Sequence, residues 1–287
     1  MNNTVTELIS RFDKHDISSS RVNAEVMLSH ILGCRIIDLY TKDMKLTKEH
    51  IDCLENMVIR RVHGEPLQYI TGKVHFYGNE LFIKEGVFIP RPETEILVDV
   101  VIGLLIQHSM QDAKSLPLIY DLCTGSGNIA ISLTKALSRC KIISSDISDD
   151  ALYTAKKNSR LNGVYDRIKF IKSDLFDIPG SYRNRFDIIV VNPPYISSDE
   201  IEHLSSEVRR EPEKALDGGK DGLEFYNHIL KKAPSFLKKN GFIALELPDG
   251  KDKELRELIA FHSDFKDIRI FKDLNNIGRV ITAQKDG

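Results

Sequence analysis

Apolar residues recur every three or four positions through the first quarter of the chain, a spacing that predicts helices. One helix is expected from Ser20 to Gly33, which would end it, and a second from Thr47 to His63. The expected buried stripe of the first helix is formed by Val22, Val26, Met27, His30 and Ile31. We therefore expect residues 1–73 to form a helical bundle domain.

The pattern becomes extended between residues 74 and 90. Two short apolar segments flank Tyr77-Gly78-Asn79-Glu80, a composition typical of a turn. We expect a β-hairpin here that links two domains.

Strand and helix patterns then alternate to the end of the chain, within a second domain expected at residues 91–287. Such alternation predicts an α/β fold with a mostly parallel sheet that is covered by helices on both faces. The expected strands are 116–122, 141–146, 167–172, 187–192, 241–247, 267–272 and 279–284, and the expected helices are 93–108, 128–138, 149–162, 222–239 and 251–262.

Composition and charge narrow the class of protein. The 287 residues contain 40 Lys and Arg against 42 Asp and Glu, which gives a net charge of −2 and no general attraction for nucleic acid or anionic lipid. The longest apolar run, 100–106, is too short to span a membrane, and the first residues lack the apolar core of a signal peptide. We therefore expect a cytoplasmic protein. The four Cys and nine His show no metal-ligand spacing, so no metal site is expected.

A glycine-rich loop follows the first strand of the expected sheet. Gly125, Gly127 and Ala130 fit G-x-G-x-x-A, a loop found in dinucleotide enzymes and also suited to other adenosine cofactors. Asp121 at the strand tip would repel a pyrophosphate and favours a cationic ligand such as S-adenosylmethionine (SAM). Asp146, at the end of the next strand, is then expected at the ribose and Asp174 at the adenine.

The expected strand at 187–192 ends in Asn192-Pro193-Pro194-Tyr195, because proline cannot extend a central strand. Two acceptors, the side-chain oxygen of Asn192 and the carbonyl of Pro193, can bind the two hydrogens of an amide or exocyclic amine. They would aim the nitrogen at a methyl donor and stabilise the positive charge that develops on it. Tyr195 would stack on the planar group. We interpret Asn192, Pro193 and Tyr195 as the catalytic residues of a nitrogen methyltransferase.

Several motifs together resemble one family. They are 89–95 (IPRPETE), 121–127 (DLCTGSG), 192–195 (NPPY), 211–223 with Tyr226, and 60–69. The chain is similar to the peptide chain release factor N5-glutamine methyltransferases (PrmC/HemK family) over about residues 17–282.

The resemblance implies a class I SAM-dependent methyltransferase fold, which is Rossmann-like and has a seven-stranded sheet with an antiparallel last strand. It also implies that an N-terminal domain, which recognises the substrate, precedes this fold in the sequence. It implies methylation of the side-chain amide nitrogen of the Gln in the Gly-Gly-Gln loop of peptide chain release factors, with S-adenosylhomocysteine (SAH) as product. The implied cofactor residues are Asp121, Cys123, Thr124, Gly125, Ser126, Gly127, Asp146, Asp174, Leu175 and Asn192; the implied substrate residues are Asn192, Pro193, Pro194, Tyr195, Arg91 and Pro92.

The chain departs from the family pattern at three places. Cys123 stands where glycine is usual, which is tolerable if the position needs no positive φ. Asn276 stands where glycine is common, and asparagine accepts left-handed geometry. Residues 246–251 (ELPDGK) lack the usual glycine and glutamine. The last two departures affect the expected rim of the site.

Other functions remain open at this level. An adenine-N6 DNA methyltransferase would use the same two-acceptor chemistry, although it would need a basic groove to bind and flip its base. A non-catalytic module that keeps SAM as a structural ligand is a second alternative. An NAD enzyme would leave the Asn-Pro-Pro-Tyr motif without a role.

Overall fold

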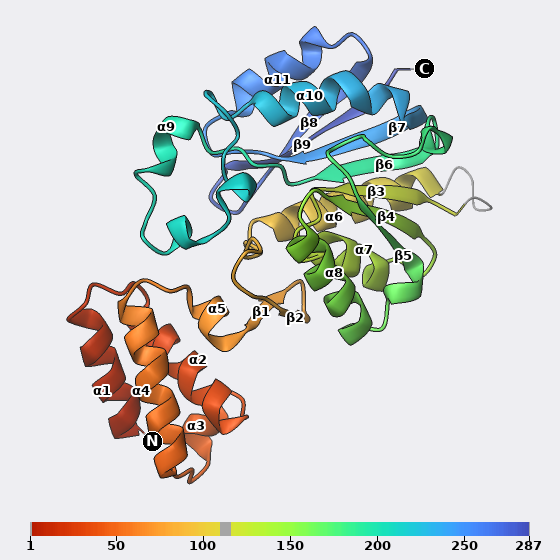
Figure 1. Cartoon of the computed structure of the whole chain (residues 1–287). Helices are drawn as coiled ribbons and strands as arrows, with labels where there is room; N and C mark the ends of the chain where they lie inside the picture. Colours follow the sequence, from red (N-terminus) through yellow and green to blue (C-terminus); the bar gives the residue numbers. More distant parts are fainter. Residues whose placement is uncertain (1, 110–115, 287) are drawn as a thin grey trace. The chain divides into compact units, whose positions relative to one another are not determined.

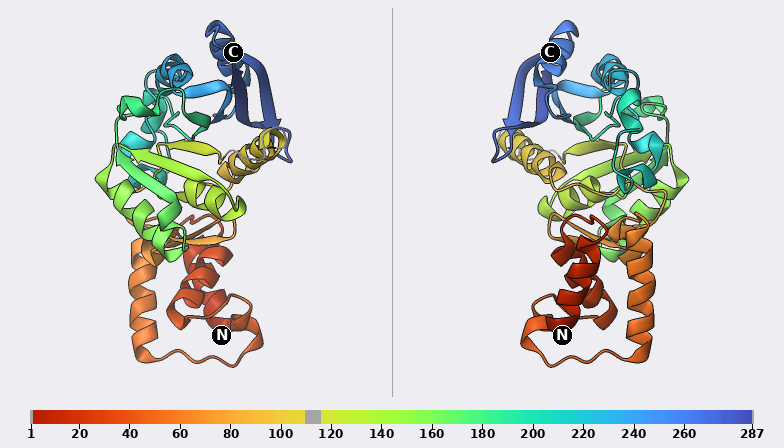
Figure 2. Two further views of the ribbon diagram at one scale, coloured as in Figure 1. Left: turned by 90° about the vertical axis from the view of Figure 1, so that its right-hand side faces the viewer. Right: turned by 90° about the vertical axis from the view of Figure 1, so that its left-hand side faces the viewer.

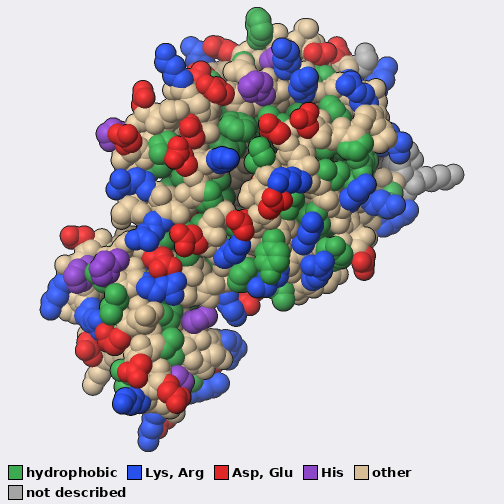
Figure 3. All heavy atoms as spheres, in the orientation of Figure 1, with side chains coloured by type: hydrophobic (Ala, Val, Ile, Leu, Met, Phe, Trp, Pro, Cys, Tyr) green, Lys and Arg blue, Asp and Glu red, His purple; other side chains and the backbone are tan. Residues whose placement is uncertain are grey.

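The computed structural model describes residues 2–109 and 116–286 (Figure 1). Their contacts divide the chain into two compact units, one of Met1–Lys73 with Ser205–Arg210 and one of Val74–Leu204 with Glu211–Gly287. Acidic and basic side chains are interspersed on the face drawn in Figure 3, as the near-zero net charge predicts.

The first unit is helical. Its helices are α1 (Asn2–Asp13), α2 (Ser20–Leu32), α3 (Asp38–Thr41), α4 (Lys48–Val62) and α5 (Leu67–Thr71). The predicted helices at 20–33 and 47–63 are confirmed, and the Thr47 side chain caps α4 by accepting from the His50 amide. The stripe predicted for α2 is partly wrong, because Val22 is 52 % exposed while Asn23, Ala24 and Leu28 are buried.

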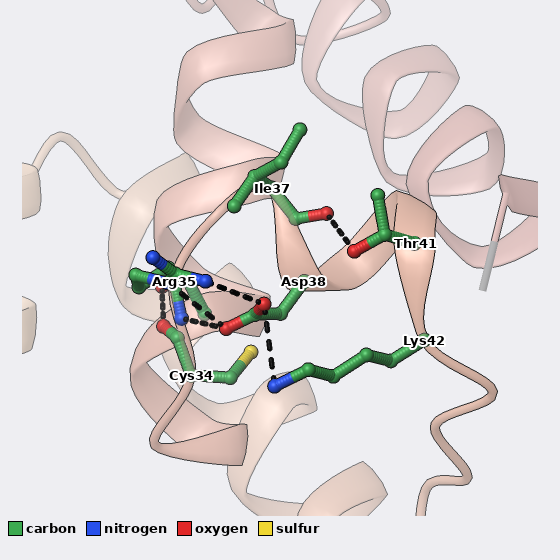
Figure 4. A network of polar contacts seen from close by, with 7 residues as sticks. Cys34, Arg35, Ile37, Asp38, Thr41 and Lys42 are labelled. Carbon is green, nitrogen blue, oxygen red and sulfur yellow. Dashed lines mark hydrogen bonds and ion pairs between the residues drawn. The ribbon is translucent and has the colours of Figure 1, made fainter.

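A polar network holds the short helix α3 (Figure 4). The Asp38 carboxylate accepts from the backbone and side chain of Arg35 and lies 3.3 Å from the Lys42 ammonium. The hydrogen bond from the Arg35 side chain lowers the pKa of Asp38 to about 2, and the hydrogen bond from Lys42 contributes to this lowering. The Thr41 hydroxyl donates to the Ile37 carbonyl. The network therefore compensates for a helix too short to be stable by itself.

The segment Ser205–Arg210 belongs to the first unit although it is distant in sequence. Arg61, which is 4 % exposed, donates to Asn23 Oδ1 at 2.7 Å and pairs with Glu207. Arg210 donates to the His63 carbonyl. Nothing in the apolar pattern indicates this attachment.

The hairpin is formed by β1 (Lys73–Phe76) and β2 (Asn79–Phe82), and all of it except Lys73 belongs to the second unit. Tyr77 and Gly78 have φ values of 49° and 70°, the pair of positive values that a two-residue type I′ turn requires. The predicted turn, Tyr77 to Glu80, is therefore two residues too long, since Asn79 and Glu80 already lie in β2.

A seven-stranded sheet forms the core of the second unit, in the order β5-β4-β3-β6-β7-β9-β8 (Figures 1 and 2). β3, β4, β5, β6 and β7 pair in parallel, and β9 runs antiparallel to both of its neighbours, as the resemblance implies. The strands are β3 (Leu118–Leu122), β4 (Lys141–Asp146), β5 (Ile168–Lys172), β6 (Phe186–Val191), β7 (Leu237–Glu246), β8 (Phe265–Lys272) and β9 (Gly278–Lys285).

Helices cover both faces of the sheet, which confirms the predicted fold class. Alternate residues of β3 point to opposite cores: Tyr120 packs with residues of α10 (Glu224–Lys232) and α11 (Asp252–Phe261), and Ile119 packs with residues of α6 (Thr94–Ser109) and α7 (Asn128–Ala136). α8 (Asp149–Leu161) packs against β4 and β5. The short elements are α9 (Ser198–Ile201), η1 (Tyr165–Arg167), η2 (Gly180–Tyr182), η3 (Val208–Arg210), η4 (Glu213–Ala215) and η5 (Ala233–Ser235).

The helix predicted at 222–239 is wrong at its end. α10 stops at Lys232, Pro234 lies in the short η5 turn, and β7 begins at Leu237. A proline removes one backbone donor and clashes with the preceding helical turn, so the chain leaves the helix there. None of the helices in the described ranges is long and apolar enough to cross a membrane.

Candidate active site

The carboxyl ends of four parallel strands lie side by side. Leu122 at the end of β3 pairs with Ser145 of β4 on one side and with Val191 of β6 on the other. Asp146 at the end of β4 pairs with Lys172 of β5. The loops that follow these strands therefore meet at one edge of the sheet, where open α/β sheets bind their ligands.

The glycine loop turns sharply from β3 into α7. Gly125 and Gly127 have φ values of 54° and 82°, which side chains rarely adopt. A Cβ on Gly127 would lie 3.0 Å from the Cβ of Ala155, so this glycine also permits α7 and α8 to approach. The Gly125 amide donates to Asp146 Oδ2 at 2.9 Å, which ties the loop to the end of β4.

Cys123 does not meet the condition that the sequence analysis set. Its φ is 60°, so the position does require the left-handed region, and cysteine occupies it with strain. Burial raises the pKa of its thiol well above the ordinary value, and the carboxylates of Asp146, Asp121 and Asp174 raise it further. The three acids predicted at successive strand ends thus all act electrostatically on this one thiol.

Asp121 is fully buried, and within residues 2–109 and 116–286 only one of its two carboxylate oxygens has hydrogen-bond partners of good geometry. Its Oδ2 accepts from Thr124 Oγ1 at 2.5 Å and from Ser144 Oγ at 3.1 Å. Its Oδ1 has no hydrogen-bond partner of good geometry among the described residues. Burial raises the pKa of Asp121 to about 7, and the two hydroxyls and the Ala130 amide offset only part of that effect. Such a carboxylate fits a cationic ligand.

The other predicted cofactor residues lie around the same loop. Both oxygens of Asp146 accept backbone amides, from Gly125 and Ser148, and burial still raises its pKa. Asp174 is exposed. Leu175 has a φ of 45°, and its carbonyl accepts from Tyr120 Oη at 2.8 Å. Acidic side chains and a glycine turn, with no basic group acting on Asp121, Cys123 or Asp146 among the described residues, fit SAM better than a dinucleotide.

Asn192 follows directly after β6. Its Nδ2 donates to Thr94 Oγ1 at 3.3 Å. Within the described part of the chain, no protein donor reaches Asn192 Oδ1 or the carbonyl oxygen of Pro193. Pro193 and Pro194 are buried, which holds the backbone rigid on both sides of that carbonyl. Two acceptors are thus uncommitted at the tip of the strand.

A glycine-rich loop packs onto the motif, a contact that sequence reasoning did not find. The Ile196 amide donates to the Leu216 carbonyl, and the Gly218 amide donates back to the Ile196 carbonyl. A Cβ on Gly218 would lie 2.7 Å from the Cα of Tyr195. Glycines at 218 and 222 are the signal that could have suggested a close backbone approach.

Arg91 and Pro92 form the turn that starts α6. Their carbonyls accept from the amides of Thr94 and Glu95. The Arg91 guanidinium forms an ion pair with Glu211, and the Glu211 carboxylate also accepts from the Ile89 amide. The guanidinium lies over the ring of Phe88, with its Cζ 4.8 Å from the ring centroid. Arg91 therefore braces the start of α6.

Comparisons with known proteins identify the family of this chain. Residues 4–72 match the PrmC N-terminal domain family, and residues 115–282 match a methyltransferase domain family. A release factor glutamine methyltransferase of Chlorobaculum tepidum is 37 % identical over 279 residues, covering 96 % of this chain and 94 % of the relative. The chain belongs to the release factor glutamine methyltransferase family.

Further relatives extend this result. The family member of Clostridium botulinum is 38 % identical over 275 residues, covering 95 % and 94 % of the two chains. A bifunctional methyltransferase of Rickettsia typhi is 37 % identical over 94 % of this chain, which spans 54 % of that relative. Among solved structures, the catalytic domain of hMettl16 in complex with an RNA hairpin superposes with a TM-score of 0.56 at 16 % identity, over 84 % of this chain and 83 % of that one. That likeness shows the methyltransferase fold.

The departures at the rim have different outcomes. Asn276 has a φ of 64°, which confirms that asparagine accepts the left-handed geometry there. Asp273 supports this turn, because its carboxylate accepts from the amides of Asn275 and Ile277 and from Arg279. In the 246–251 tract, Gly250 has a φ of 74° and supplies the turn before α11.

Proposed function

We propose that this family member transfers the methyl group of SAM to the side-chain amide nitrogen (N5) of a glutamine in peptide chain release factors, within their Gly-Gly-Gln loop. The observation that carries the proposal is the pair of uncommitted acceptors, Asn192 Oδ1 and the Pro193 carbonyl, beside a cluster of acids suited to a cationic cofactor. Family membership favours this substrate over adenine in DNA and over a non-catalytic role.

The cofactor would supply a methyl group already activated on a sulfonium. Asp121, Cys123, Thr124, Gly125, Ser126 and Gly127 would form its cradle at the end of β3. Asp146 keeps unused lone pairs for the ribose hydroxyls, and Asp174 and Leu175 would flank the adenine. The unpartnered Oδ1 of Asp121 would face the positively charged end.

The substrate amide is a poor nucleophile, because its nitrogen lone pair is delocalised. Asn192 Oδ1 and the Pro193 carbonyl would each accept one N–H and hold the nitrogen in line with the methyl group. Positive charge develops on that nitrogen during transfer, so both hydrogen bonds strengthen in the transition state. Tyr195 would stack on the amide plane, supported by Pro194. Once cationic, the nitrogen can lose its proton to water without a dedicated base.

The first unit would recognise the release factor, with Arg91 and Pro92 contributing to the substrate side of the second unit. Release factors act on ribosomes, so we expect the enzyme to work in the cytoplasm. No nucleic-acid contact is needed for the proposed reaction.

A methyl-transfer assay with labelled SAM tests the proposal. Purified release factor, the same factor with the Gln of its Gly-Gly-Gln loop changed to Ala, and unmethylated duplex DNA would be offered in parallel. Label on the intact factor alone is the expected result. Label on DNA, or equal label on both forms of the factor, would contradict the proposed substrate.

A further inference from the structure

Thr94, the first residue of α6, joins the ends of two neighbouring strands of the sheet. Its side chain is completely buried, and its hydroxyl accepts from Asn192 Nδ2 at 3.3 Å. The carboxylate of Glu246 is within reach of the same hydroxyl, and hydrogen bonding to that hydroxyl lowers the pKa of Glu246 in part. Glu246 ends β7, which pairs with β6 one residue earlier, at Leu245 and Val191. Thr94 and Glu246 are buried and Asn192 is half-buried, so the three side chains form a chain that leads from the interior to the end of β6.

The direction of these hydrogen bonds follows from their chemistry. An ionised carboxylate only accepts, and a threonine hydroxyl has one proton to donate. Thr94 must therefore give its proton to Glu246, and it can only accept from Asn192. An acceptor at Thr94 selects the amide orientation in which Nδ2 faces Thr94 and Oδ1 faces away from it.

We propose that Thr94 and Glu246 are positioning residues that orient the Asn192 amide so that its oxygen is presented to the substrate. The inference rests on the proposed function, in which Asn192 Oδ1 accepts from the substrate amide. An Asn192 amide rotated by 180° would present a donor to a nitrogen that is itself a donor. Orientation of this one group thus decides whether the site can bind its substrate productively.

The position of Glu246 supports a role beyond packing. It is 3 % exposed, and its Oε2 has no partner among the residues that the structure describes, which is a costly arrangement for a group that only fills space. Burial raises the pKa of Glu246 to about 7, while the Thr94 hydroxyl lowers it in part. The charged and titratable groups that face it are Glu93, Arg91, Arg279, Tyr195 and Tyr226.

Protonation of Glu246 removes the constraint. A neutral carboxyl can donate to Thr94, whose own proton is then free to bond Asn192 Oδ1. Both amide orientations become accessible, so the fraction of correctly oriented enzyme falls as pH drops below about 7. The positive charges of Arg279 and Arg91 act against protonation of Glu246, and the negative charge of Glu93 favours it.

Three threonine variants test the proposal. Thr94→Val keeps the shape and removes the hydroxyl, and Thr94→Ser keeps the hydroxyl. Thr154→Val is the matched control, because Thr154 is also fully buried and its hydroxyl has no partner in the described ranges. For each protein, kcat and KM for release factor and the Kd for SAH would be measured. The side-chain amide signals of Asn192, assigned by their absence from the spectrum of Asn192→Asp, would be recorded by NMR.

Thr94→Val is expected to lower kcat by about 10- to 100-fold, with the Kd for SAH unchanged within about twofold, and to shift the Asn192 amide signals. Thr94→Ser and Thr154→Val should leave both readouts near wild type. Unchanged Asn192 signals in Thr94→Val would overturn the proposal, and so would equal loss of kcat in Thr94→Val and Thr94→Ser. If wild type labels no release factor, the proposed function fails, and the NMR comparison still decides whether Thr94 anchors the amide.

Discussion

Gly222 lies directly against the backbone of Tyr195: a Cβ added to Gly222 would sit 2.4 Å from the Tyr195 carbonyl oxygen. Gly222 also has a φ of 74°, so a side chain there meets both a clash and an unfavourable backbone conformation. We expect Gly222→Ala to push the 216–223 loop away from Tyr195. Turnover should fall at least about tenfold, and the free energy of unfolding should fall by about 2 kcal/mol.

A second glycine provides the control for this variant. Gly103 lies within α6, has no positive φ, and has open space at its Cβ position. Gly103→Ala should raise stability by up to about 1 kcal/mol and leave turnover unchanged. Both variants would be followed by thermal denaturation and by initial rates. Wild-type turnover in Gly222→Ala would show that the loop does not position Tyr195.

The fold was predictable because its elements repeat a simple pattern. Strands β3 and β6 are short, mostly apolar runs, each with a single Asp, so their positions follow from hydrophobicity and length. The boundary between α10 and β7 was not predictable, since residues 233–239 have no turn signal except Pro234. The attachment of 205–210 to the first unit depends on Arg61 and Glu207, a contact between distant residues that leaves no local pattern.

The site was predictable only where it follows strand ends. Asp121 is the second-last residue of β3, Asp146 ends β4 and Asn192 directly follows β6, and parallel strands place these ends at one edge. Thr94 was missed as the partner of Asn192, and Glu246 as a neighbour of Thr94, because they come from the start of a helix and from another strand. The positive φ of Cys123 was also missed, since a residue type alone does not reveal its backbone conformation.

Substitution of Asn192 should mainly reduce turnover, and substitution of Asp146 should mainly reduce cofactor affinity. Asn192→Ala removes one of the two acceptors that strengthen in the transition state, so we expect kcat to fall by about 10²- to 10³-fold with SAM affinity nearly unchanged. Asp146→Ala removes the anchor of the Gly125 amide, so SAM affinity should fall first, by about tenfold or more. Isothermal titration with SAH and initial rates would be compared. A large loss of SAH affinity in Asn192→Ala would contradict its assigned role.

The backbone conformation at Cys123 should lower the stability of the protein relative to a variant with glycine there. A side chain at a φ of 60° costs about 1 kcal/mol, and β-branched residues are the least compatible with it. We expect the free energy of unfolding to follow the order Cys123→Gly, wild type, Cys123→Val, with a gain of about 0.5 kcal/mol for glycine after its larger unfolded-state entropy is counted. Chemical denaturation of the three proteins measures this order. Lower stability in the glycine variant than in wild type would mean that packing of the thiol outweighs the strain.

Cofactor affinity should increase with pH through the titration of Asp121. In the free protein the pKa of Asp121 is raised to about 7 by burial, so below pH 7 most molecules carry a neutral carboxyl there. A ligand that places an ammonium group against Asp121, as both SAM and SAH can, favours the ionised form, and its binding must therefore release a proton at low pH. Between pH 5 and 7 the affinity for SAH should rise with pH by up to about tenfold per unit, and it should level off once Asp121 is ionised.

The slope of this dependence distinguishes Asp121 from its neighbours. Asp121→Asn still accepts from Thr124 and Ser144 but cannot ionise, so its affinity for SAH should be lower at pH 7 and should vary less between pH 5 and 7. A smaller slope is expected to persist, because burial also raises the pKa of Asp146. Isothermal titration in two buffers with different ionisation enthalpies counts the protons released by each protein. Equal slopes and equal proton release in wild type and Asp121→Asn would show that Asp121 does not meet the charged end of the ligand.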